Sequence, residues 1–531
     1  MITKRIDQTS FNEFPNCMQQ KVVQDNKRIA KNTIFLYIRM LFVMGVSLFT
    51  SRVVLDKLGV EDYGIYNAVG GVVAMLMFLN GTLSTSTSRF LTFELGRNDI
   101  VRLTSTFSTA FYAHLILALL VALFMETIGL WFVYNKLIIP PDRMYAALWV
   151  FHISIFTAFI AITQVPYTSV IIAHENMKVY AYMGIFEAVA KLVIVYLLVI
   201  SSVDKLIFYA CLVGIVQLLI AGFYRLYCVR NYIESHISIL FDKSILRGML
   251  SFSGLSLLAN VSHVLSVQGL VVLMNMFFQP VVVAAQAIGN QLTNAMMQFV
   301  GNLQTALNPQ IIKLYATGAY AESRRLTLQS SVYVHELMLL LCLPAIVTMD
   351  SLLHLWLVEV PAYAVIFAQY IILKQLFNVY NMTLYTPMIA SGKLLSNSLA
   401  ALFGGIGVFI LLYALLKLGF DVMWIQYISV FQAALFSYIV KPYILCKEIG
   451  YSWSEILWSF WGCVKVSVIP VLVSVLCYQY VAIQNMINMF TVIACIGISV
   501  VVSAYIFLDK STRLKLHNYL KQIIFNRIHF S

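Results

Sequence analysis

The chain has 531 residues, of which 61% are apolar and 11% are charged, and its formal net charge is +12. A soluble globular domain of this composition would have too little polar surface to cover its core, so the chain is not a soluble protein. Apolar stretches of about 20 residues, the length that spans a bilayer, recur along the whole sequence.

In chain order, the apolar runs and the breaks between them predict fourteen transmembrane helices. Runs of this length exclude a transmembrane barrel, whose strands would read as alternating segments of about 10 residues. The first thirty residues contain no apolar core, so they are not expected to be a cleaved signal peptide. The predicted spans are 33–54, 62–84, 105–133, 145–173, 179–200, 205–228, 246–276, 281–305, 327–349, 362–390, 394–416, 421–443, 456–480 and 486–508.

The distribution of basic residues predicts the orientation. With a cytoplasmic N-terminus and fourteen crossings, 25 Lys and Arg residues fall on the cytoplasmic side and 6 on the other side. This asymmetry is typical of a protein with both termini in the cytoplasm. It also accounts for the net positive charge, so a nucleic-acid partner is not expected.

The sequence resembles itself when it is shifted by about 220 residues. The segment "TSRFLTFELGRNDIVRLTS" after the second span aligns with "LNPQIIKLYATGAYAESRRLT" after the eighth span. Two six-helix lobes in the same orientation follow, related by a pseudo-two-fold axis along the membrane normal, as in some transporters. We expect a cytoplasmic tail at 1–31, an N-lobe at 32–232 and a C-lobe at 233–445. Two further spans and a cytoplasmic C-terminal tail make up 446–531.

Two stretches near the start resemble a known family. "SRVVLDKLGVEDYGIYNAVGGVVAML" (Ser51 to Leu76) and "STSTSRFLTFELGRND" (Ser84 to Asp99) are similar to the opening of bacterial O-antigen-type polysaccharide flippases. These proteins belong to the multidrug, oligosaccharidyl-lipid and polysaccharide exporter (MOP) superfamily. The resemblance implies two lobes that alternate between inward-open and outward-open states in the bacterial inner membrane.

It further implies what the protein carries and for what purpose. The expected substrate is an oligosaccharide repeat unit on a polyprenyl diphosphate carrier, moved from the cytoplasmic to the periplasmic leaflet for assembly of O-antigen, capsule or exopolysaccharide. The expected partners are the lipid bilayer and this lipid-linked oligosaccharide. A glycan polymerase, glycosyltransferases and a coupling cation, H⁺ or Na⁺, are candidate partners, and no cofactor or metal is expected.

Charged residues inside the predicted spans are the first candidates for the substrate site. A charge near a span centre costs on the order of 2.5 to 3.5 kcal/mol, so these groups should face water or a partner. Lys374 lies deep in the tenth span with no acid within four positions, and Arg39 lies in the first span. Both could hold a diphosphate, whereas the structural alternative for Lys374 is an ion pair with Glu126 or Glu336.

Glu187 and Lys191 are four residues apart in the fifth span, with the acid first. This spacing puts both side chains on one helix face in the favourable order for an ion pair. A static structural pair is one interpretation. The other is a switch in which the anionic substrate competes with Glu187 for Lys191.

The eighth span carries a carboxamide at every fourth position. Steps of four residues advance by about 400°, so the row drifts by only about 40° per step and forms one winding stripe. Amides donate and accept hydrogen bonds, which suits sugar hydroxyl groups, although amides also hold membrane helices together. The row comprises Gln286, Asn290, Asn294, Gln298 and Asn302, and the matching positions in the first half are Tyr66, Gly70, Ala74, Phe78 and Thr82.

The seventh span adds a second polar face. Ser253, Ser256, Asn260 and His263 follow one another at spacings of three and four residues. We expect Asn260 and His263 to contribute to the same substrate site, with hydrogen bonding between the seventh and eighth spans as the alternative.

Two other functions remain open from the sequence. An ion-coupled multidrug exporter would need deep acids, and Glu126, Glu187 and Glu336 would have to serve as its coupling residues. A membrane enzyme of glycan assembly, either a polymerase or a ligase, is the second alternative. The short outside connections and the absence of GxxxxGK[ST] and HExxH motifs argue against catalysis, so the expected protein is a transporter and not an enzyme.

Overall fold

The computed structural model describes residues 41–508 except 98, 175, 239–240 and 482–484, together with residue 513. In these described residues the secondary structure is helical throughout, with no strand. Ten helices among them are long and apolar enough to cross a membrane. The prediction of an all-α polytopic membrane protein is therefore confirmed.

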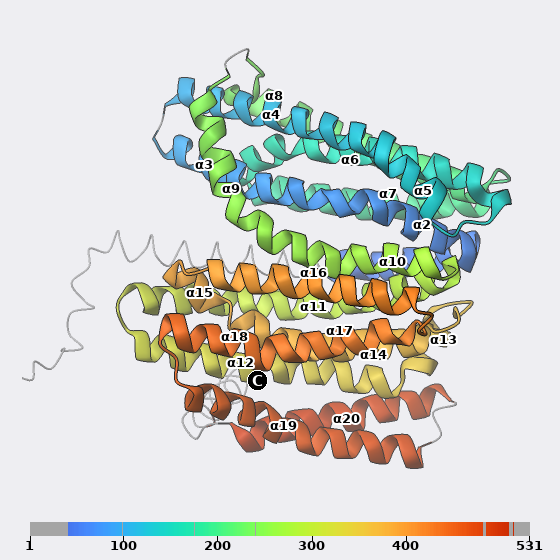
Figure 1. Cartoon of the computed structure of the whole chain (residues 1–531), viewed down its shortest axis with the longest axis vertical. Helices are drawn as coiled ribbons and strands as arrows, with labels where there is room; N and C mark the ends of the chain where they lie inside the picture. The colour runs from blue at the N-terminus through green and yellow to red at the C-terminus, as the bar shows by residue number, and fades with distance from the viewer. Residues whose placement is uncertain are drawn as a thin grey trace, which may run out of the picture.

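The first half of the chain forms a group of helices that we call the N-lobe, at the top of Figure 1. Its helices follow a first described helix over residues 41–58. They are α2 (Val60–Ala74), η2 (Met75–Met77), α3 (Phe78–Gly96), α4 (Ile100–Phe124), η3 (Met125–Gly129), α5 (Leu130–Lys136), η4 (Pro141–Arg143), α6 (Met144–Ala173), α7 (Met177–Ile200), α8 (Lys205–Asn231) and η5 (Ile233–Ser235).

The second half forms a group that we call the C-lobe, in the middle of Figure 1, with α19 and α20 beneath it. Helix α9 runs from the N-lobe to the C-lobe. The helices are α9 (Lys243–Val264), η6 (Leu265–Gly269), α10 (Leu270–Phe277), α11 (Pro280–Ala316), α12 (Tyr320–Val347), α13 (Met349–Trp356), α14 (Ala364–Thr383), α15 (Thr386–Ser391), α16 (Leu395–Lys417), α17 (Met423–Leu435), η7 (Phe436–Val440), α18 (Lys441–Ile444), η8 (Leu445–Ile449), α19 (Trp453–Tyr480) and α20 (Met486–Phe507).

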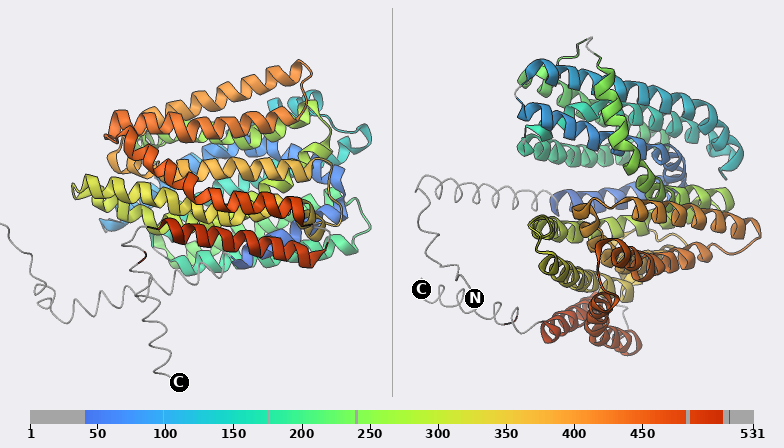
Figure 2. Two further views of the ribbon diagram at one scale, coloured as in Figure 1. Left: turned by 90° about the horizontal axis from the view of Figure 1, so that it is seen from below. Right: turned by 60° about the vertical axis from the view of Figure 1, so that its left-hand side comes forward.

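Within the described residues, each of the fourteen predicted spans corresponds to one helix or to a series of consecutive helices, with a turn at residues 384–385 inside the tenth. The largest differences are at α3, which continues twelve residues past the predicted end at 84, and at α11, which continues eleven residues past the predicted end at 305. At 1.5 Å per residue its 37 residues measure about 55 Å, well beyond the hydrocarbon core of about 30 Å. The views in Figure 2 show the long helices lying side by side in one direction, with α19 and α20 at the edge of the bundle.

Local sequence signals explain several helix ends. The side chains of Asp99 and Asp204 accept hydrogen bonds from the first-turn N–H groups of α4 and α8. Ser452 and Glu455 form a reciprocal capping box at the start of α19. Gly59, at φ 82°, breaks the chain between the first described helix and α2, a conformation that glycine adopts without strain.

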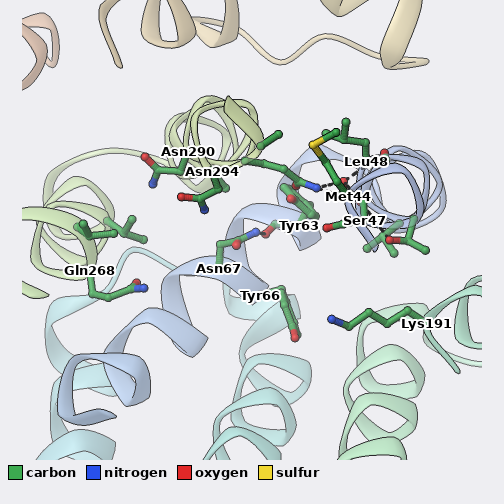
Figure 3. A pocket seen from close by; sticks show the side chains of 18 of the residues that line it. Met44, Ser47, Leu48, Tyr63, Tyr66, Asn67, Lys191, Gln268, Asn290 and Asn294 are labelled. Carbon is green, nitrogen blue, oxygen red and sulfur yellow. Dashed lines mark hydrogen bonds between the residues drawn. The ribbon is translucent and has the colours of Figure 1, made fainter. Parts of the chain in front are cut away.

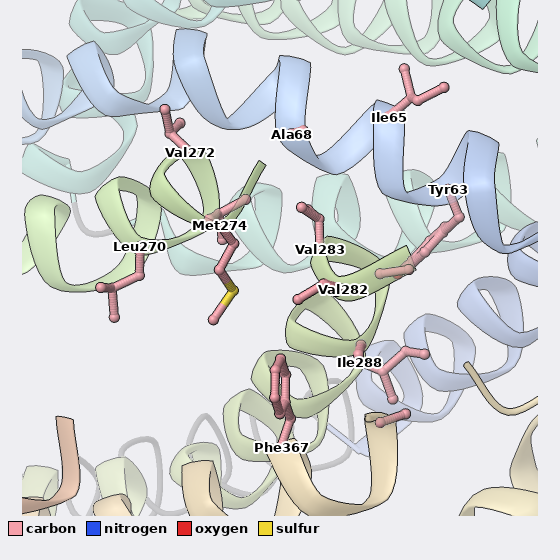
Figure 4. Packing of buried hydrophobic residues seen from close by; sticks show 14 of the residues in the cluster. Tyr63, Ile65, Ala68, Leu270, Val272, Met274, Val282, Val283, Ile288 and Phe367 are labelled. Atoms are coloured by element: carbon pink, nitrogen blue, oxygen red, sulfur yellow. The ribbon is translucent and has the colours of Figure 1, made fainter. Parts of the chain in front are cut away.

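The core lies where the two lobes meet. Tyr63, Ile65 and Ala68 of α2 pack over α10 and the start of α11 (Figure 4). The same cluster continues through Val283 of α11 to Phe367 of α14, both fully buried. This dry contact holds α2 against α11, two helices that contain positions matched by the predicted internal repeat.

Two elements join the lobes in a way that the sequence alone did not indicate. The first described helix is bound to the C-lobe: Gln291 of α11 donates to the carbonyl oxygen of Ser47 at 3.0 Å, and Trp356 of α13 donates to that of Leu48 at 2.8 Å. Conversely, the start of α9 is bound to the N-lobe, where Ser86 of α3 donates to the carbonyl oxygen of Met249 at 3.1 Å.

Candidate functional site

A cavity of about 410 Å³ lies between the first described helix, α2, α7, α8, η6, α10 and α11, and we call it the central cavity. Elements of both lobes contribute to its wall (Figure 3). Its polar lining includes Ser47, Ser51, Tyr66, Asn67 and Gln268, in addition to residues of the amide row on α11 and to Lys191. A water-accessible polar space at this position, between the lobes, is where transporters with two related halves bind their substrates.

The structure divides the predicted amide row. Asn290, Asn294 and Gln298 line the central cavity. Gln286 is only 3% exposed and does not line the cavity: its side-chain oxygen accepts a hydrogen bond of 2.8 Å from Gln426 of α17, and its amide donates to the side-chain oxygen of Asn290 at 3.4 Å. Three amides thus face the cavity, one ties α11 to α17, and the side chain of Asn302 lies outside the described residues.

Lys191 is the one charged residue among the twenty that line the central cavity. Its ammonium group points toward the space beside Tyr66 (Figure 3). Glu187, one turn earlier on α7, accepts a hydrogen bond of 2.7 Å from it, and both side chains are about half exposed. The predicted pair therefore exists and is accessible, so an anion entering the cavity can reach Lys191 without breaking a buried ion pair.

Lys374 lies elsewhere. It lines a small enclosed cavity of about 10 Å³ within the C-lobe, together with Ser429 and Gln432 of the α17 segment. This volume holds about one water molecule. Lys374 forms no ion pair with any described residue, so neither Glu126 nor Glu336 neutralises it in this conformation.

The remaining predicted residues do not line the central cavity. Glu126 on η3 pairs with His152 of α6 at 3.0 Å. Glu336 is half-buried on α12 and forms no ion pair within the part of the chain that the structure describes. Arg39 lies outside the described residues, as do the side chains of Asn260 and His263 on α9.

A second cavity, of about 420 Å³, lies among α2, α6 and α8 of the N-lobe, with Gln268 of η6 at its edge, and we call it the N-lobe chamber. Tyr66, Asn67 and Gln268 line both this chamber and the central cavity. Gly70 and Ala74 also line it. Three of the five first-half positions that match the amide row, Tyr66, Gly70 and Ala74, therefore line a cavity of their own.

Sequence reasoning missed Asn67 and Gln268. Asn67 stands in an apolar helix as a single amide, with no neighbour at helical spacing that would draw attention to it. Gln268 lies on the π-helical turn η6, whose wider turn shifts the register between α9 and α10. No sequence signal marked that turn. No group of three or more metal-binding side chains occurs in the described ranges.

The lobes close against each other at the end that the basic-residue distribution assigns to the outside. Asn275, at the end of α10, accepts a backbone hydrogen bond of 3.1 Å from Ile138. Gly64 of α2 lies directly on the backbone of Pro280 at the start of α11. These contacts bring the two lobes together at that end.

An ion-pair network holds the N-lobe together at the same end. Arg143 bridges Asp62 of α2, at 2.5 Å, and Asp204 before α8, at 2.7 Å. Burial alone would raise the pKa of Asp204, but hydrogen bonds from Arg143 and from backbone N–H groups of α8 lower it below its ordinary value. The Arg143–Asp204 pair therefore stays ionised at neutral pH.

Solved structures of transporters have the same fold. The lipid II flippase MurJ, in an inward closed conformation, superposes with a TM-score of 0.66 at 11% identity, covering 89% of this chain and 98% of that chain. The MATE multidrug transporter DinF-BH superposes with a TM-score of 0.57 at 11% identity, covering 80% and 94%.

An inward-facing multidrug resistance MATE family transporter of the MOP superfamily gives a TM-score of 0.51 at 12% identity, covering 82% and 98%. No family model matches the chain, and no curated protein matches it in sequence. At these identities the likeness concerns the fold: the chain has the fold of membrane transporters of the MOP superfamily.

Proposed function

We propose that this protein is a flippase that moves polyprenyl-diphosphate-linked oligosaccharides from the cytoplasmic to the periplasmic leaflet of the bacterial inner membrane, for assembly of a surface polysaccharide such as O-antigen. The observation that carries the proposal is the lining of the central cavity. It combines one accessible cation, Lys191, with uncharged amides and hydroxyl groups on both lobes. A diphosphate needs a cation and hydrogen-bond donors, and a sugar needs groups that both donate and accept.

Lys191 binds the diphosphate in this proposal, and Glu187 holds Lys191 in place while the site is empty. Because both side chains are about half exposed, their pairing is worth only about 0.2–1 kcal/mol. A doubly charged phosphate group can therefore displace Glu187 from Lys191 at little cost. The pair then acts as a switch: Lys191 binds Glu187 when the cavity is empty and binds the diphosphate when the substrate is present.

The rival function, ion-coupled export of a cationic drug, has support from the MATE-like fold. It would require a carboxylate to receive the cation. None of the residues that line the central cavity is acidic, and Glu187 beside it is already paired with Lys191. The electrostatics of this cavity therefore favour an anionic substrate.

The test measures binding of undecaprenyl diphosphate to the protein in nanodiscs by native mass spectrometry. Lys191→Met should weaken binding at least tenfold, whereas Lys191→Arg should retain most of it. Lys417→Met, an exposed lysine at the end of α16, is the matched control and should bind like wild type. Equal binding by wild type and Lys191→Met would exclude this role for Lys191.

Two further variants refine the assignment. Glu187→Gln should tighten binding by no more than about fivefold, the equivalent of an exposed ion pair, and should slow transport in proteoliposomes because the product is released later. Lys374→Met should change binding by less than about twofold, because Lys374 does not line the central cavity in this conformation. Strong loss of binding in Lys374→Met would mean that the C-lobe opens to admit the substrate.

A further inference from the structure

The N-lobe chamber differs chemically from the central cavity that it adjoins. None of its fourteen lining residues carries a charge, whereas the central cavity contains Lys191. The two spaces meet at Tyr66, Asn67 and Gln268, which line both. A ligand held at Lys191 can therefore extend past Tyr66 into a compartment that offers it no cation.

The polar groups of the chamber are free to bind. The side chains of Gln217 and Gln268 form no hydrogen bond with any other described residue. The side-chain amide of Asn67 donates to the carbonyl oxygen of Tyr63 at 2.7 Å, which leaves its oxygen available as an acceptor. Ser154 and Thr157 donate to backbone carbonyl groups of α6, so their oxygens can likewise accept.

The chamber is kept open by small residues. Gly70, Gly71 and Ala74 on α2 face Ala158 and Ala161 on α6 across a space of about 420 Å³. A Cβ atom added at Gly70 would meet no atom within 4 Å. This volume falls within the range of about 300–1,000 Å³ that is typical of small-molecule sites. Unpaired amides inside a membrane protein are costly unless water or a ligand satisfies them.

We infer that the N-lobe chamber is a binding site for uncharged sugar residues and that it discriminates against sugars bearing a carboxylate. This inference rests on the proposed function, with the diphosphate at Lys191 and the sugar beyond Tyr66. Sugar hydroxyl groups can donate to the acceptor oxygens of Asn67, Ser154 and Thr157 and accept from the two glutamine amides. A carboxylate only accepts, so it would leave the acceptor oxygens unpaired and would find no counter-charge.

Three ligands test the inference on the protein in nanodiscs, with dissociation constants measured by native mass spectrometry. They are undecaprenyl diphosphate, the same carrier bearing a neutral disaccharide, and the carrier bearing a disaccharide with one uronic acid. Wild type should bind the neutral glycolipid about tenfold more tightly than the bare carrier, a difference of about 1.4 kcal/mol. The uronic acid glycolipid should bind no more tightly than the bare carrier.

Filling the chamber should remove this preference selectively. Gly70→Leu should raise the dissociation constant of the neutral glycolipid about tenfold and leave that of the bare carrier within about twofold. Gly222→Leu on α8 is the matched control, since a side chain there also meets no atom within 4 Å and Gly222 lines neither cavity. Gln217→Leu, which removes an amide without adding bulk, should act like Gly70→Leu and guards against a folding defect in one variant.

The outcomes separate this inference from the proposed function. If wild type binds none of the three ligands, both the proposed function and the inference about the chamber are refuted. If the bare carrier binds through Lys191 but Gly70→Leu and Gln217→Leu leave neutral glycolipid binding unchanged, the chamber holds water only and the inference alone is overturned. Equal affinity for the uronic acid and neutral glycolipids would also overturn it.

Discussion

A side chain at Gly64 would collide with the C-lobe at the outer end, where the two lobes meet. The Cβ of an alanine at this position would lie 2.0 Å from the carbonyl oxygen of Pro280 and 2.6 Å from its carbonyl carbon. Both atoms belong to the backbone, so no rotamer change relieves the contact. Gly64→Ala should therefore prevent α2 and the start of α11 from closing as they do here.

The size of the effect follows from this geometry. Cβ atoms essentially never approach another heavy atom closer than 3.0 Å, so from 2.0 Å the two backbones must separate by about 1 Å. Strain from one added methyl group in a well-packed contact costs about 1–3 kcal/mol. That energy corresponds to a shift of about 5–150-fold toward conformations in which the outer ends of the lobes are apart. Alanine is also the better helix former, so α2 itself is not weakened.

Electron–electron double resonance measures the separation of the lobes directly. Spin labels replace Lys136 at the end of α5 and Leu418 after α16, both exposed at the outer end, in a chain without its native cysteines. Gly64→Ala should shift the distance distribution to longer values. Gly45→Ala, where a Cβ meets nothing within 4 Å, is the matched control. An unchanged distribution in Gly64→Ala would refute the idea that this contact limits closure.

Three further outcomes are expected. Replacing Asn290 and Asn294 together by Leu should leave the melting temperature near that of wild type but lower transport about 5–150-fold in proteoliposomes, because two hydrogen bonds of about 0.5–1.5 kcal/mol each are lost. Gln286→Leu should do the reverse, since it strands a buried amide on α17 at a cost of about 1–3 kcal/mol in stability, while transport per folded molecule persists. Arg143→Leu should lower the melting temperature. Because the pKa of Asp204 is lowered, the stability that the Arg143–Asp204 pair contributes is fully present above the ordinary value of 3.8 and is lost only as the pH falls through the lower folded value, so the part of the difference from wild type that this pair causes should be constant between about pH 8 and about pH 5.

The helices were predictable because membrane insertion imposes a simple length rule. A run of about 20 apolar residues has few alternatives to a transmembrane helix, so all fourteen spans correspond to observed helices within the described residues. The helix ends that differ most from the predicted span ends lie beyond the apolar runs, where this length rule does not act. The C-terminal end of α11, up to Ala316, is the example.

The sites were less predictable. The spacing of residues along a helix shows which side chains share a face, but it does not show whether that face contacts a cavity, another helix or lipid. The spacing of four put Gln286 and Asn290 on one stripe, yet the drift along the stripe turns Gln286 to Gln426 and Asn290 to the central cavity. Lys374 and Lys191 are each a cation in an apolar run, and only the acid four residues before Lys191 distinguishes them in sequence. One lies inside the C-lobe and the other faces the cavity, a difference that only the packing of helices far apart in sequence decides.

The attachment of the first described helix to the C-lobe has a mechanical consequence. The chain leaves that helix at Gly59 and enters α2 of the N-lobe at the same outer end where Gly64 touches Pro280. The chain connection between the lobes, at Gly59, and the close contact between them, at Gly64 and Pro280, therefore lie at the same place. Any relative movement of the lobes would therefore have to bend the chain at Gly59 and separate Gly64 from Pro280 at the same place.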